Sequence, residues 1–103
     1  MSSFFVSDAA SLRIDEIYRY TRKTWGDPQA RKYILGLFDL FDQLARRERP
    51  WRVIPAEFGV QGYFTQYEKH FLFWRKRKDG GISILSILAQ NMDVANHLSS
   101  DAK

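Results

Sequence analysis

The clearest alternation of hydrophobic and polar segments lies in residues 70–88 (HFLFWRKRKDGGISILSIL). Apolar runs at 71–74 and 82–88 flank a charged stretch that ends in Asp79, Gly80 and Gly81. Glycine beside aspartate supplies the positive φ that a tight hairpin turn requires. The flanking runs are rich in β-branched and aromatic residues, which suit a packed, pleated surface. This pattern predicts a β-hairpin.

Neither run of this hairpin has a polar face. We expect Phe71 and Phe73 on one side and Leu72 and Trp74 on the other; in the second run, Ile82 and Ile84 are expected opposite Leu85 and Ile87. A strand that is apolar on both faces needs cover on both faces. A chain this short can cover one face with its own helices, so we expect a partner on the other.

Helical periodicity dominates the first half of the chain. The apolar positions from Ala10 to Trp25 predict a first helix of roughly four turns, capped by Ser7 or Asp8 and ended by Gly26. Residues 28–47 predict a second helix, with Asp27 as N-cap, Pro28 in the first helical position, and Arg46 and Arg47 in the last turn. The apolar positions are Ala10, Ile14, Ile17, Tyr18, Thr21 and Trp25 in the first helix, and Ala30, Tyr33, Ile34, Leu37, Phe38, Phe41, Leu44 and Ala45 in the second. The short link between them predicts an antiparallel helical hairpin.

Weaker signals complete the chain. Residues 3–7 suggest an edge strand, 49–57 an irregular crossing with one short turn, and 62–67 a strand. Residues 92–98 suggest a short helix capped by Asp93, followed by a frayed tail. The expected fold is α+β, a single domain spanning 1–103: a two-helix antiparallel hairpin on a small, mostly antiparallel β-sheet, with a short C-terminal helix.

The composition bears on the cellular compartment and on the charge of possible partners. Cysteine is absent, which excludes disulfides and favours a reducing compartment. The first ten residues lack the pattern of a signal peptide, and no run is long enough to cross a membrane, so we expect a cytoplasmic protein with no membrane partner. The net charge is +4 and the pI about 9.6. The sixteen Lys and Arg residues either solvate the surface or attract an acidic partner.

The sequence gives little indication of a catalytic site or a metal-binding site. The only histidines are His70 and His97, without a metal-binding spacing, and no glycine-rich phosphate loop is present. Asp15 and Glu16 are adjacent, hence about 100° apart on a helix, and do not converge as a catalytic pair. We therefore expect no metal and no cofactor.

Two groups have both a functional and a structural interpretation. Tyr63, Tyr67 and Trp74 could stack nucleic-acid bases, although aromatic residues in strands are usually core residues. The basic run Arg75, Lys76, Arg77 and Lys78 is either a solvated turn or a finger that contacts an anion.

Three segments resemble the ParE branch of the RelE/ParE toxins. Residues 17–30 (IYRYTRKTWGDPQA) with Tyr33 are similar to the pattern IxxYTxxxWGxxQAxxY, and Leu44-Ala45 to the end of the helix that follows it. Residues 67–75 (YEKHFLFWR) resemble the HxIFYR strand of the family, and 84–93 (ILSILAQNMD) its IxRILHxRMD ending. The resemblance implies a helical hairpin on a three-stranded antiparallel sheet with the first strand added at one edge.

The same resemblance implies the toxin of a type II toxin–antitoxin pair. Such a toxin inhibits DNA gyrase by binding, needs no catalytic residue, and is neutralised by a ParD-like antitoxin whose C-terminal segment folds onto it. DNA would be met only through the antitoxin or gyrase. The alternative is a RelE-like ribosome-dependent mRNA endonuclease. That branch relies on basic and aromatic residues where this chain has Ser86, Ala89 and Asn91, so it would need a new set such as His70, Arg75 and Tyr67. A member of the family that has lost its toxicity is a third possibility.

The resemblance and the apolar pattern together suggest contact residues. We expect the antitoxin on Ile17, Phe73, Trp74, Leu85 and Ile87. The target is expected on the basic run Arg75, Lys76, Arg77 and Lys78 and on Asn91, Met92 and Asp93.

Overall fold

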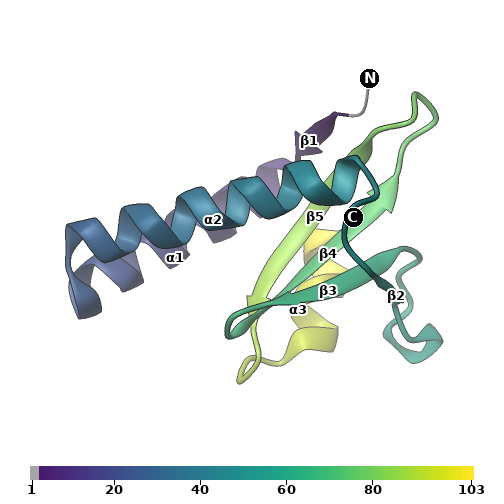
Figure 1. The fold of residues 1–103 in the computed structure, drawn as a ribbon. Helices are drawn as coiled ribbons and strands as arrows, with labels where there is room; N and C mark the ends of the chain where they lie inside the picture. The colour runs from purple at the N-terminus through teal and green to yellow at the C-terminus, as the bar shows by residue number, and fades with distance from the viewer. Residues whose placement is uncertain (1–2) are drawn as a thin grey trace.

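The computed structural model describes residues 3–103; residues 1–2 of the predicted domain lie outside that part. The element order is β1 (Phe4–Val6), α1 (Asp8–Trp25), α2 (Asp27–Ala45), β2 (Arg52–Val53), a short 3₁₀ turn η1 (Ala56–Phe58), β3 (Tyr63–Tyr67), β4 (His70–Lys76), β5 (Ile82–Ala89) and α3 (Val94–Asp101). Figure 1 shows α1 and α2 side by side across one face of the sheet, with α3 against the other. The α+β prediction is confirmed.

The sheet has five strands in the order β1-β5-β4-β3-β2. Strand β1 pairs in parallel with β5, and the other pairs are antiparallel. The predicted strands and the hairpin are therefore confirmed, with β1 at one edge. The two-residue strand β2, which pairs with Tyr63 and Phe64 of β3, was not foreseen in the irregular crossing.

Helix caps largely follow the sequence. The Ser7 hydroxyl accepts a hydrogen bond from the Ala10 amide at 3.1 Å, as predicted for an N-cap. The predicted cap at Asp27 is wrong, because Gly26 occupies that position with φ 94° and Asp27 is the first helical residue, which makes Pro28 the second. The predicted last turn is also wrong, because α2 ends at Ala45 and Arg46 is its C-cap. The Asp27 carboxylate instead accepts a hydrogen bond from the Tyr18 hydroxyl at 2.9 Å, which joins the two helices near their connection.

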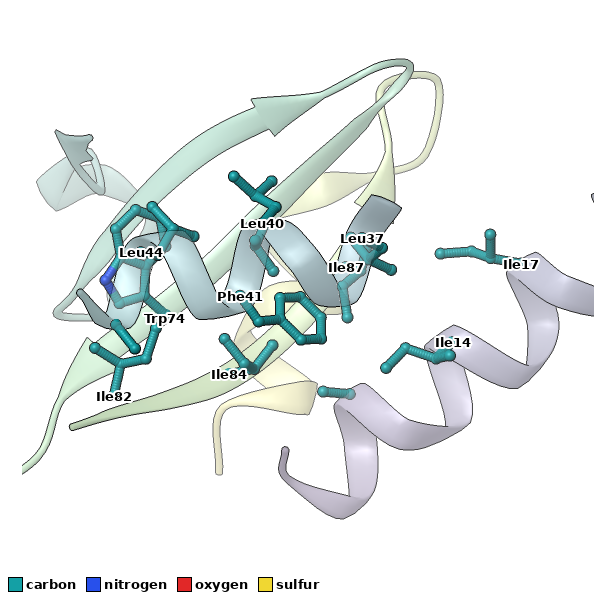
Figure 2. Packing of buried hydrophobic residues seen from close by; sticks show 13 residues of the cluster. Ile14, Ile17, Leu37, Leu40, Phe41, Leu44, Trp74, Ile82, Ile84 and Ile87 are labelled. Carbon is teal, nitrogen blue, oxygen red and sulfur yellow. The ribbon is translucent and has the colours of Figure 1, made fainter. Parts of the chain in front are cut away.

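The main core lies between the helical hairpin and the sheet (Figure 2). Leu37, Phe41 and Leu44 of α2 are 0–1% exposed. They and residues of α1 pack onto a common set of sheet residues: Leu72 and Trp74 of β4, and Ile82, Ile84 and Ile87 of β5. Burial of this apolar surface is what holds the two layers together.

A bulge in β5 changes the expected faces of that strand. Phe73 pairs with Ser86 and Trp74 pairs with Ile84, which leaves Leu85 as an extra residue. Leu85 packs on the α3 side, as expected, but Ile87 lies on the helical-hairpin side together with Ile82 and Ile84. The prediction that Ile87 faces away from Ile82 and Ile84 is therefore wrong.

The second face of the sheet is covered by the chain itself. Phe73, Leu85 and Leu88 pack against Leu98 of α3 and against Ile54, which precedes η1. This cover contradicts the expectation that one sheet face needs a partner. Helix α3 also extends to Asp101, so the predicted frayed tail is wrong: Ser99, Ser100 and Asp101 are helical.

Candidate functional site

A groove of about 590 Å³ opens between α1 and the end of the β4–β5 hairpin that lies away from its tip. We call it the groove throughout. Its lining residues come from α1, from the start of β4 and from the end of β5 with the loop that follows: Arg13, Glu16, Ile17, Tyr20, Lys69, His70, Ile87, Ala89, Gln90, Asn91 and Met92. The wall is largely apolar with charged groups at its rim, which suits an amphipathic segment.

An ion-pair network fixes α3 behind this groove. Arg13 Nε and Nη2 donate to Asp101 Oδ2 and Oδ1 at 2.8 and 3.2 Å, and Nη2 lies 3.2 Å from His97 Nδ1. The Ser86 hydroxyl donates to Asp101 Oδ2 at 2.6 Å. Hydrogen bonding to Asp101 raises the pKa of Arg13, so this guanidinium stays charged. The network joins α1, β5 and α3.

Two tyrosines and His70 fix α2 on the sheet. The Tyr33 hydroxyl lies 2.6 Å from His70 Nδ1, and the Tyr67 hydroxyl donates to the Tyr33 carbonyl at 2.9 Å. Burial lowers the pKa of His70, so the ring is neutral at pH 7 and shares its hydrogen bond with the Tyr33 hydroxyl as an uncharged imidazole. Burial also raises the pKa of Tyr33, to about 12, with a further contribution from Tyr67.

Glycine is required where Tyr67 meets α2. A Cβ atom on Gly36 would lie 2.2 Å from the Tyr67 hydroxyl oxygen, well inside van der Waals contact. The missing side chain at Gly36 therefore allows the hydrogen bond between the Tyr67 hydroxyl and the Tyr33 carbonyl to form.

The catalytic set considered for an mRNA endonuclease is only partly assembled. Tyr67 and His70 pair across β3 and β4, but Arg75 lies near the opposite end of β4, where its Nε donates to the Gln61 carbonyl at 3.1 Å. Among residues 3–103, no group of three His, Cys, Asp or Glu side chains could hold a metal ion. Within the same residues, no helix is both long and apolar enough to cross a membrane.

The five residues expected to bind an antitoxin are all buried, at 2–8% exposure. Ile17 and Ile87 border the groove. Phe73 and Leu85 lie in the core beneath α3, and Trp74 lies in the core beneath the helical hairpin. Two of the five thus line the groove, and the other three do not.

The residues expected to bind a target fall into two places. Arg75, Lys76, Arg77 and Lys78 are exposed around the hairpin tip. Asn91 and Met92 line the groove at the other end of the hairpin, and Asp93 caps α3 and accepts a hydrogen bond from Asn96 Nδ2 at 2.6 Å.

Sequence reasoning missed several lining residues of the groove. Tyr20 is 69% exposed, and Arg13 and Lys69 contribute charge at the rim. The signal for Tyr20 was its spacing: Leu12, Glu16 and Tyr20 lie four residues apart on α1, next to the buried stripe that contains Ile17.

Comparisons of the sequence with known families and with known proteins point to the same family. The family described as the ParE toxin of the type II toxin-antitoxin system parDE matches residues 4–94. Toxin ParE of Escherichia coli is 28% identical over 103 residues, covering 100% of this chain and 99% of that protein. Toxin ParE1 of Mycobacterium tuberculosis is 32% identical over 98 residues, covering 94% of this chain and 98% of that protein.

A solved structure of the chromosomal ParDE TA system from P. aeruginosa has the same fold. It superposes with a TM-score of 0.67 at 21% identity, covering 86% of this chain and 96% of that one. The family resemblance found in the sequence motifs is therefore confirmed over most of the chain.

Proposed function

Because the chain belongs to the ParE toxin family of type II toxin–antitoxin systems, we propose that it inhibits DNA gyrase by binding and that a ParD-like antitoxin neutralises it. The observation that supports this proposal is that the family matches residues 4–94, which run from the start of β1 to the start of α3. In this proposal the toxin contributes a binding surface and no catalytic group.

The groove is the proposed seat of the antitoxin. Ile17, Ile87 and Met92 offer apolar contact at the floor, and Tyr20 offers an exposed ring at the edge. Lys69 is an exposed cation at the rim, which favours an acidic segment through long-range attraction. A segment that is disordered alone and folds onto an apolar groove fits this arrangement.

We keep Ile17 and Ile87 as contact residues in this proposal. Phe73, Trp74 and Leu85 are not contact residues in this proposal, because they lie in the two cores beneath the helices and do not line the groove.

We propose that the target contacts both ends of the β4–β5 hairpin. Asn91 and Met92 would then serve the target as well as the antitoxin, since both line the groove. An antitoxin seated in the groove would exclude the target from these residues, which gives neutralisation a steric basis. Residues 75–78 would supply charge at the other end.

A supercoiling assay tests the proposal. Purified chain added to gyrase and relaxed plasmid should reduce supercoiling and accumulate linear DNA after denaturation, and equimolar antitoxin should restore supercoiling. An assay of mRNA cleavage on ribosomes should give no product. Unimpaired supercoiling, or cleavage of mRNA on ribosomes, would overturn the gyrase proposal; the second result would assign the chain to the endonuclease branch.

A further inference from the structure

The positive charge of the protein is concentrated in two segments. Residues 46–53 and 75–79 together contain eight Lys or Arg residues and two acidic residues. Their combined charge of +6 exceeds the net charge of the whole chain, +4, so the remainder of the chain carries −2. The other eight Lys and Arg residues are spread over the rest of the chain, where acidic residues outnumber them, so the net positive charge comes from these two segments.

These two segments form one surface, which we call the basic end. Lys76 Nζ lies 5.7 Å from the centroid of the Trp51 ring and 5.1 Å from that of Tyr63. Trp51 precedes strand β2, which pairs with β3, which in turn pairs with β4. Figure 1 shows the hairpin tip and the C-terminal end of α2 on the same side of the molecule.

Several cations of the basic end are held in place by their neighbours. The Arg77 guanidinium lies 5.3 Å from the Phe5 ring centroid, and its Nη1 donates to the Ser83 hydroxyl at 3.2 Å. Arg75 is held by the Gln61 carbonyl. Cations that are already positioned lose less side-chain entropy when they meet an anion.

We propose that the basic end binds the phosphate backbone of duplex DNA. Six of its eight cations are arginines, whose planar guanidinium group matches phosphate oxygens in pairs. The Trp51 and Tyr63 rings are engaged by Lys76, and the Phe5 ring by Arg77. Bases of a single strand would need such ring faces for stacking. Backbone contact with a duplex needs none of them.

Duplex DNA and duplex RNA would offer the basic end the same chemical group, a phosphate backbone. The choice of DNA over duplex RNA rests on the proposed gyrase target, because gyrase holds duplex DNA. The binding test itself contains no gyrase. Loss of DNA binding with intact gyrase inhibition would therefore overturn only this inference, and the converse would overturn only the proposed function.

The experiment measures binding of the purified full chain to a fluorescently labelled 20-base-pair DNA duplex between 50 and 200 mM salt. About four phosphate contacts predict a slope near −4 in a plot of log affinity against log salt. The test variant combines Arg49→Gln, Arg52→Gln, Arg75→Gln and Lys78→Gln, and should lose at least about 30-fold in affinity at 50 mM salt. The matched control removes four exposed cations from the helical hairpin: Arg19→Gln, Arg22→Gln, Lys23→Gln and Lys32→Gln.

The control should keep the affinity within about threefold and the slope within one unit. Equal losses in both variants would show a response to net charge alone and would overturn the proposal. Tighter binding of duplex RNA, or of polyglutamate, would assign the surface to another partner. The single variants Arg52→Gln and Lys78→Gln, each expected to lower the slope by about one, keep the test valid if the fourfold variant unfolds.

Discussion

Arg13 of α1 and Asp101 of α3, 88 positions apart in the chain, are joined by hydrogen bonds of 2.8 and 3.2 Å. Their side chains are only 16% and 10% exposed. The pair therefore fixes the last helix over the second core of the sheet, and its charges are shielded from water on most sides.

Substituting Asp101→Ala should lower the free energy of unfolding by about 2 kcal/mol, because it leaves the Arg13 guanidinium and the Ser86 hydroxyl without their acceptor. Urea unfolding followed by circular dichroism measures this loss. Asp42→Ala is the matched control: its ion pair with Arg46 is half exposed and should be worth no more than about 0.5 kcal/mol. Equal effects of the two substitutions would contradict the structural role of Arg13 and Asp101.

The close approach of Tyr67 to α2 gives a second prediction. Gly36→Ala would usually strengthen a helix, but here the new methyl group meets the Tyr67 hydroxyl oxygen, so stability should fall by about 2 kcal/mol. Combining Gly36→Ala with Tyr67→Phe removes that oxygen and should recover more than half of the loss. Additive effects of the two substitutions in thermal unfolding would show that the clash is absent.

The lowered pKa of His70 gives a dependence of stability on pH. Because the folded-state pKa lies below the ordinary value near 6.5, the unfolded chain takes up a proton first as the pH falls. The stabilisation is complete above about pH 7 and is lost as the pH drops through 6.5 towards the folded-state pKa. Urea unfolding from pH 8 to pH 5 should show this decline, and His70→Gln should flatten it. An unchanged profile in the variant would assign the decline to other groups.

The end of α2 offers a stabilising substitution. Arg47 has φ 62° and completes a helix-ending turn in which the Glu48 amide donates to the Gln43 carbonyl at 2.9 Å. Arg47→Gly should raise the free energy of unfolding by about 0.5–1 kcal/mol, because glycine adopts this conformation without a Cβ penalty. Arg46→Gly, at φ −86°, is the control and should lower it. Chemical unfolding that ranks the two variants in the opposite order would refute this explanation.

The proposed antitoxin groove predicts a charge-sensitive contact at Tyr20. Tyr20→Glu should weaken antitoxin binding at least about tenfold in calorimetric titration, because it puts a negative charge where the apolar face of an acidic segment would dock. Tyr20 is 69% exposed, so folding of the variant should be unaffected. Leu35→Glu alters a side chain of matching exposure on α2, outside the groove, and should leave the affinity unchanged. Comparable losses in both variants would place the antitoxin elsewhere.

Local patterns predicted most of the fold, because the helical hairpin and the β4–β5 hairpin obey short-range rules. The stripe from Ala30 to Ala45 and the turn at Asp79 and Gly80 are examples. The bulge at Leu85 could not be predicted from the neighbouring sequence. Leu85 and Ser86 are compatible with either face of the sheet until the residues that pair with them on β4 are known. The anchoring of Asp101 also escaped prediction, because its partner Arg13 is near the other end of the sequence.

The candidate site was predicted less well for a related reason. The pattern of a strand identifies its apolar residues, and the most apolar ones, such as Phe73 and Trp74, are those that the fold buries in its core. The pattern therefore selected core residues as contact residues. An open groove depends on which apolar residues remain uncovered, as Tyr20 does, and that follows from packing between distant elements. The motif resemblance identified the family without resolving this question.

Strand β1 joins the sheet only through β5, where Phe4 pairs with Ile82 and Val6 with Ile84. During synthesis, β1 therefore emerges well before β5, the strand with which its backbone pairs. Such distant pairings slow folding and leave apolar surface open during synthesis. A chain that ends before β5 could not complete the sheet and would leave apolar surface uncovered, which proteases and chaperones recognise.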